Sequence, residues 1–76
     1  MKRFVKVMVY YELDGTFTPK VIIWSKDKKF DIDKITDISY TKPPADKDVG
    51  LCFSCLICGK ERNLYFEENR WFVQTK

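Results

Sequence analysis

Apolar and polar residues alternate along most of this chain, a pattern that is typical of half-buried β-strands. Over residues 4–13 the odd positions are all apolar, whereas the even positions mix apolar and charged side chains. A turn at Asp14-Gly15 comes next, and then the β-branched residues 21–24 and the alternating residues 30–33, separated by a turn at residues 26–29. The N-terminal part of the chain therefore predicts three antiparallel strands.

The register of the second and third strands decides where Trp24 points. Any two- or four-residue turn within residues 26–29 places Ile23 opposite Ile32. The same register puts Trp24 beside Asp31 on the other face of the sheet. We therefore expect Trp24 to point away from the core, toward solvent or another element.

The alternation breaks after residue 33, because Ile32, Ile35 and Ile38 are spaced by three residues rather than two. Either bulges or one helical turn would explain this spacing. We favour a bent, bulged continuation of the third strand to about Tyr40, since Thr36, Ile38 and Tyr40 are strand formers.

Residues 51–75 predict a three-stranded β-meander with turns at Gly59-Lys60 and Glu68-Asn69. The inward side chains then form two rows across the strands: Phe53 with Phe66 and Trp71, and Cys55 with Leu64 and Val73. The prolines within residues 42–50 cannot donate ladder hydrogen bonds, so this segment is expected to be the one long loop.

These elements predict an all-β fold: a small six-stranded antiparallel meander that closes into an SH3-like or partly open barrel. With 76 residues, the chain is expected to form a single domain over 1–76. Aromatic residues make up 16% of it and supply the large side chains that a small core needs. The alternative is a curved single sheet that buries one face by dimerising.

Three sizeable apolar residues fall on the outward face of the meander, namely Leu56, Tyr65 and Phe72. Tyr65 is expected directly opposite Phe72, with Leu56 diagonal to Tyr65. One interpretation is that the N-terminal strand or the 42–50 loop covers this patch and completes the core. The other is a surface for protein binding or self-association, since adjacent exposed aromatics are favoured interface anchors.

The charge is modest and evenly spread, with 14 Lys and Arg against 11 Asp and Glu, a net charge of +3. Lys60, Arg62 and Arg70 lie near the outward aromatics and resemble a platform for stacking nucleic-acid bases. They sit at turns rather than along a groove, which makes nucleic acid the second choice of partner.

No catalytic or metal-binding pattern is evident. The chain has no histidine, so the commonest general base and the usual partner of a cysteine nucleophile are missing. The spacing Cys52-x-x-Cys55-x-x-Cys58 is suggestive, but structural zinc needs four ligands. A strand also sends Cys55 to the opposite face and separates Cys52 from Cys58 by roughly 20 Å. We therefore expect no enzyme activity, no metal or cofactor, and no small-molecule substrate.

The sequence also predicts a cytoplasmic protein that does not enter a membrane. No run approaches the roughly 18 apolar residues that span a bilayer, and residues 4–13 lack the features of a signal peptide. An odd number of cysteines within seven residues fits a reducing compartment.

Parts of the sequence resemble a group of small uncharacterised proteins from Gram-positive bacteria that are often linked to mobile elements. The resemblance covers about two thirds of the chain and is carried by residues 20–24 (KVIIW), 30–33 (FDID), 59–62 (GKER), 65–66 (YF) and 70–73 (RWFV). It implies a compact β-barrel of bacterial, cytoplasmic origin, and no assigned activity comes with it. The sequence as a whole predicts a non-enzymatic interaction module, with protein as the first choice of partner.

Overall fold

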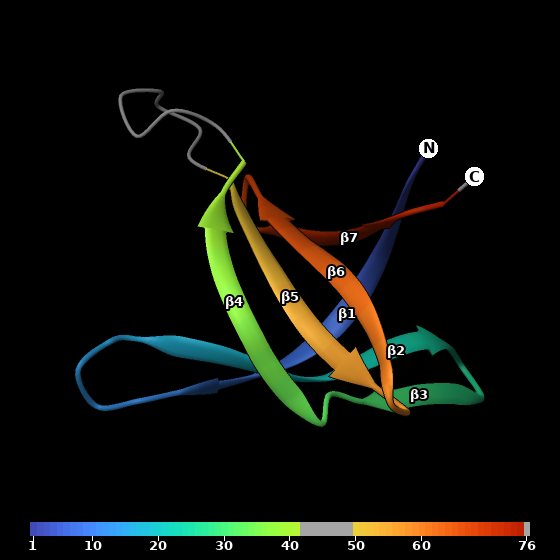
Figure 1. Ribbon diagram of the computed structural model, residues 1–76, viewed down its shortest axis with the longest axis horizontal. Coiled ribbons are helices and arrows are strands. Elements are labelled where there is room, and N and C mark those ends of the chain that lie inside the picture. Colours follow the sequence, from blue (N-terminus) through green and yellow to red (C-terminus); the bar gives the residue numbers. More distant parts are fainter. Residues whose placement is uncertain (42–49, 76) are drawn as a thin grey trace.

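A computed structural model describes residues 1–41 and 50–75, which form seven antiparallel strands in one curled sheet (Figure 1). The strands are β1 (Lys2–Tyr11), β2 (Phe17–Ser25), β3 (Lys28–Asp31), β4 (Lys34–Tyr40), β5 (Leu51–Ile57), β6 (Lys60–Glu67) and β7 (Arg70–Gln74). Their order across the sheet is β3-β2-β1-β7-β6-β5-β4. The predicted all-β fold and partly open barrel are confirmed.

The curl originates in β1, which is shared between two halves of the sheet. Residues 2–5 pair with β7, whereas residues 6–11 pair with β2. The pairing of β1 with β2 skips Lys20, so β2 carries a bulge there. Bulges bend a strand and increase its twist, which helps one sheet wrap around its own concave face.

The prediction of six strands is wrong, because the expected third strand divides into β3 and β4. At the division, the Ile32 N–H donates to the Lys20 carbonyl of β2, and the Asp33 N–H donates to the Leu56 carbonyl of β5, each at 2.8 Å. The chain therefore passes from one end of the sheet directly to the other end. This crossing brings β3 and β4 together at one corner of the barrel (Figure 1).

The expected bulge beyond this point is confirmed. β4 ends at Tyr40, and its register with β5 shifts between Ile35 and Asp37, so that Thr36 is the extra residue. The Thr36 hydroxyl donates to the Ser54 carbonyl at 3.0 Å. The isoleucine spacing of three thus reflects an interrupted strand with one added residue.

The core lies on the concave face of the curled sheet. Its buried residues come from both halves: Ile22, Phe53, Cys55, Leu64 and Trp71. Val5, Val7 and Val9 of β1 pack against this cluster, as their alternation predicts. The inward orientation of Phe66 and Trp71 is also confirmed, with ring centroids 4.6 Å apart.

The register between β5 and β6 differs from the prediction by two residues. The turn lies at Cys58-Gly59, so Phe53 pairs with Leu64 and Leu51 pairs with Phe66. The physical reason is the turn type, since both central residues have positive φ, 53° and 75°. Such a turn favours glycine at its second position, which Gly59 supplies here. A slip of two residues leaves every side chain on its predicted face.

The turns predicted at Glu68-Asn69 and Asp14-Gly15 are confirmed, whereas the turn predicted within residues 26–29 occupies only residues 26–27, since Ser25 pairs with Lys28. Glu68 and Asn69 connect β6 to β7 with φ of 53° and 62°. Gly15 closes the β1–β2 connection with φ of 92°. There, the carboxylate of Asp14 accepts hydrogen bonds from the backbone N–H and the hydroxyl of Thr16, at 2.9 and 2.7 Å. These bonds stabilise the charged form and lower the pKa of Asp14.

The predicted register, which places Trp24 on the face opposite the core, is wrong, whereas the alternative that its ring lies against another element is confirmed by Arg3 of β1 and Phe30 of β3. The pairing of β2 with β3 skips Trp24, and Ile22 faces Phe30 while Ile23 faces Lys29. Ile22 rather than Ile23 faces the core, and Trp24, two residues further along, lies on the same face as Ile22. There its ring meets the edge of Phe30 at a centroid distance of 6.3 Å. Residues 21–24 are all apolar, so their pattern shows neither which of them faces the core nor where an extra residue falls.

Candidate functional site

The expected pair of Tyr65 and Phe72 is present on the convex face, but Phe72 is buried and Tyr65 is half-buried. The two rings stack at 5.2 Å with an interplanar angle of 11°. Phe4 of β1 meets Phe72 edge-on at 5.6 Å, and the Lys2 ammonium lies 4.7 Å from the Phe72 ring centroid. Only 2% of Phe72 is exposed. The N-terminal strand thus covers the ring, as the first interpretation of the patch predicts.

Leu56 does not belong to this cluster, so the three-residue patch is wrong as predicted. Leu56 pairs with Lys34 and Glu61, whereas the neighbour of Tyr65 on β5 is Cys52. The two-residue difference in the β5–β6 register moves Leu56 along the strand and away from Tyr65. The expected contribution of the 42–50 loop falls largely on residues 42–49, outside the described residues.

Lys60 and Arg62 line a cleft of about 690 Å³ whose walls come from β2, β3, β5, β6 and β7. It exists because β6 pairs with β7 only from Tyr65 to Glu67, so the two strands diverge beyond this short ladder. Trp24 and Phe30 contribute aromatic side chains to the same cleft. The structure therefore places two of the three predicted nucleic-acid residues beside two aromatic rings.

Arg3 fixes one of those rings in place. Its guanidinium lies 3.8 Å from the centroid of Trp24 and donates a hydrogen bond to the Trp24 carbonyl at 3.3 Å. This cation–π contact occupies one face of the indole.

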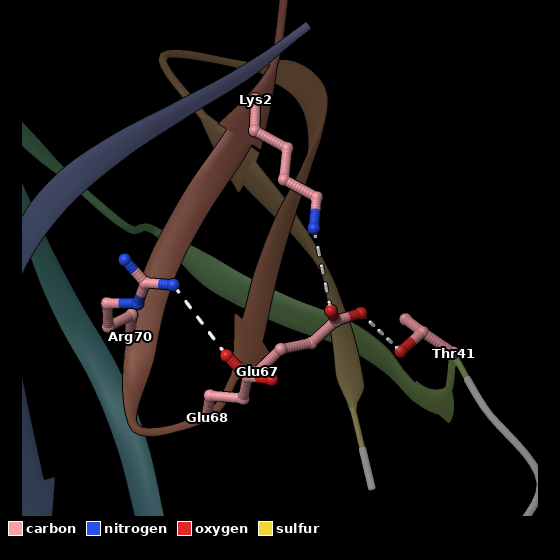
Figure 2. A network of polar contacts seen from close by, with 5 residues as sticks. All are labelled: Lys2, Thr41, Glu67, Glu68 and Arg70. Atoms are coloured by element: carbon pink, nitrogen blue, oxygen red, sulfur yellow. Dashed lines mark hydrogen bonds and ion pairs between the residues drawn. The ribbon is translucent and has the colours of Figure 1, made fainter. Parts of the chain in front are cut away.

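Arg70, the third predicted nucleic-acid residue, lies elsewhere. Its guanidinium is 4.3 Å from the Phe4 ring centroid on the convex face and forms an ion pair with Glu68 at 3.7 Å (Figure 2). The basic residues therefore do not form one continuous patch.

The largest exposed apolar side chains on the concave face belong to Tyr11, Ile38 and Tyr40, which are 69%, 53% and 63% exposed. We call these three residues the open side. Tyr11 lies at the end of β1, and the other two lie on β4, the terminal strand of the sheet (Figure 1). Sequence reasoning did not select them, because their exposure depends on β4 being at the edge.

The open side is continuous with the core. Phe17 links them, with ring centroids 5.7 Å from Tyr11, 6.1 Å from Phe53 and 5.5 Å from Phe66. Ile38 pairs with Phe53 across β4 and β5, so its side chain shares the concave face of that buried ring. The exposed residues therefore border the aromatic core directly.

Glu67 holds the end of β4 against the rest of the sheet (Figure 2). Its carboxylate accepts a hydrogen bond from the Thr41 hydroxyl at 2.9 Å and pairs with the Lys2 ammonium at 3.8 Å. Only 15% of the Glu67 side chain is exposed, so solvent screens these contacts incompletely. Gly50 permits the arrangement, because a Cβ there would collide with Thr41 and lie 2.7 Å from Glu67 Cγ.

The three cysteines occupy three different environments. Cys52 is half-buried on the convex face, Cys55 is buried in the core, and Cys58 is exposed in a turn. Burial raises the pKa of both the Cys52 and Cys55 thiols, and a hydrogen bond involving Tyr65 opposes the shift at Cys52. Within residues 1–41 and 50–75, no cluster of three or more His, Cys, Asp or Glu side chains is placed to hold a metal ion.

Comparison with known proteins gives no match, whether with protein-family models, curated proteins or solved structures. The part of the chain that the structure describes contains no helix long and apolar enough to cross a membrane.

Proposed function

We propose that the protein is a non-enzymatic interaction module that binds protein through the open side of its half-barrel. The observation that carries this proposal is the exposure of Tyr11, Ile38 and Tyr40 at the border of the aromatic core. Exposed apolar groups that rest on a packed core favour protein partners, because desolvating them gains free energy without disturbing the fold. Aromatic side chains, tyrosine above all, are frequent anchors of such interfaces.

A comparison of baits tests this proposal. Three baits are immobilised and used to capture proteins from a cell lysate: the wild-type protein, a Tyr11→Ser/Tyr40→Ser variant and a Met8→Ser/Tyr10→Ser variant. The second variant is the matched control, since Met8 and Tyr10 are 55% and 57% exposed but are on the convex face. Circular dichroism checks that both variants stay folded.

The expected result is a partner retained by the wild type and the control and lost by the open-side variant. A partner that both variants retain equally, or that only the Met8/Tyr10 variant loses, would contradict the proposal.

A second candidate function is the binding of single-stranded nucleic acid in the cleft. It is favoured by the presence of Lys60 and Arg62 beside Trp24 and Phe30, since cations and stackable rings are the usual elements of such sites. The separation of Arg70 from this group weakens the case. Fluorescence anisotropy with a labelled oligonucleotide decides it, because a phosphate-dependent complex must weaken steeply with salt and with Lys60→Gln/Arg62→Gln.

We also propose a cytoplasmic location and kinship with the small bacterial proteins that the sequence resembles. The free thiols of Cys52, Cys55 and Cys58 support a reducing compartment. Mass spectrometry of the protein isolated from host cells under acid quench tests this, since extensive oxidation of Cys58 would argue against such a location.

A further inference from the structure

The terminal strand β4 pairs with β5 along one edge, and its other edge borders no strand among the described residues. An edge of this kind presents unpaired backbone donors and acceptors. Lys34 and Asp37 are the charged residues of β4, so the strand is electrically neutral overall. The bulge at Thr36 interrupts the edge, which leaves residues 37–41 as its regular part.

The hydrogen-bond pattern shows which backbone groups are unpaired. The Thr41 N–H donates to the Gly50 carbonyl at 2.9 Å, so Thr41 directs its backbone groups toward β5. Successive residues of a strand direct these groups to alternate sides, which sends those of Ser39 toward β5 as well. Ile38 and Tyr40 therefore direct their N–H and C=O groups to the open edge.

We propose that two copies of the chain pair antiparallel through β4, with Ser39 of each copy on the two-fold axis. This inference rests on the proposed function, because it names a second copy as the protein bound at Ile38 and Tyr40 of the open side. The register places Ile38 of each copy opposite Tyr40 of the other and forms about four main-chain hydrogen bonds from the unpaired groups. A two-fold interface of this kind uses the same surface on both copies.

The side chains support this register over its neighbours. Ile38 and Tyr40 are both more than half exposed and point to the concave face, so the pairing buries two aromatic–aliphatic contacts between copies. Asp37 faces Thr41 of the second copy, so no like charges are opposed. Centring the pair on Ile38 instead would place Tyr40 opposite the irregular Thr36, where a bulge disrupts the ladder.

An interface made by one pair of short strands is expected to be weak. Sedimentation velocity over protein concentrations from about 10 µM to about 1 mM therefore tests the dimer. The wild type should shift from monomer to dimer across this range. Ile38→Pro removes an N–H that faces away from β5, so it should abolish the shift while leaving the intramolecular ladder intact. Ile38→Thr keeps the N–H and should dimerise detectably, which makes it the matched control.

Cross-linking tests the register. Ser39 pairs with Cys52 within one chain, so the background carries Cys52→Ser and Cys58→Ser. In that background Ser39→Cys should form a disulfide-linked dimer on mild oxidation, since directly opposed residues of this type are about 4.5 Å apart at Cα. Asp37→Cys, which lies two positions from the axis, should give no more cross-linked dimer than the background.

A wild-type protein that stays monomeric throughout, a dimer that survives Ile38→Pro, or equal cross-linking by Asp37→Cys and Ser39→Cys would each overturn the inference. Tyr11→Ser separates it from the proposed function, because Tyr11 lies outside the β4 pairing. A monomer that captures a different protein through Tyr11 leaves the proposed function standing. If the protein dimerises equally well with Tyr11→Ser and captures no other protein, then its binding is confined to the β4 pairing.

Discussion

Phe72→Ala should destabilise the protein strongly, although the residue lies on the face that the sequence assigns to the outside. Phe72 is 2% exposed and is enclosed by the ring of Tyr65 on one side and the edge of Phe4 on the other. Truncation would remove both ring contacts and leave a cavity that the rigid strands β1, β6 and β7 cannot close.

The magnitude follows from this burial. Truncating a buried phenylalanine to alanine costs about 3–5 kcal/mol. The whole domain of 76 residues is expected to be stable by about 4–11 kcal/mol, so Phe72→Ala removes about a quarter or more of the free energy of unfolding. Phe4 is 49% exposed, and Phe4→Ala should therefore cost only about 1–2 kcal/mol.

Urea unfolding of the wild type and both variants measures these losses, with tryptophan fluorescence as the probe because Trp71 is buried in the core. The midpoints should fall in the order wild type, Phe4→Ala, Phe72→Ala, with similar slopes. A loss below about 1 kcal/mol for Phe72→Ala, or equal losses for the two variants, would refute the view that the convex face contains a second core.

Two further predictions concern the end of β4 and the thiols. Gly50→Ala should lower the melting temperature by about 4–8 °C for each kcal/mol lost, since its Cβ must displace Thr41 or Glu67; an unchanged melting temperature in differential scanning calorimetry would contradict this. At pH 8, iodoacetamide should modify exposed Cys58 first and leave Cys55 intact, because burial raises the pKa of the Cys55 thiol and keeps it protonated; mass spectrometry that finds Cys55 modified as fast as Cys58 would count against the packing.

The sequence was sufficient to predict the fold class and the faces of most strands, but not the register between them. In the β5–β6 hairpin, the turn needs two residues with positive φ, and it therefore forms at Cys58-Gly59 rather than one residue later. The pattern of side chains repeats every two residues, so a two-residue slip keeps Phe53 inward and changes only its partner. Face is thus a robust prediction in a meander, whereas the partner of a given residue depends on the turn.

Bulges limit prediction in a different way. The extra residues Lys20 and Trp24 each interrupt a ladder, but the apolar pattern identifies neither position. The extra residue Thr36 falls where the isoleucine spacing changes, so the pattern does indicate that bulge. Trp24 shows the consequence, since its ring lies on the face of Ile22, lines the cleft and contacts Arg3. Lys60 and Arg62 could be selected from their positions in the predicted meander, but their association with Trp24 required the register of β2 and β3.

The open side results from the same crossing that divides the expected third strand. Because Ile32 bonds to β2 and Asp33 bonds to β5, the two terminal strands meet at one corner and separate from there. β4 then diverges from β3, and its outer edge is unpaired among the described residues. Ile38 and Tyr40 on its concave face are therefore more than half exposed. A closed barrel would bury these side chains and satisfy the edge within one chain. In this half-barrel, a second polypeptide could meet both requirements, because the proposed interaction surface and the β4 edge share Ile38 and Tyr40.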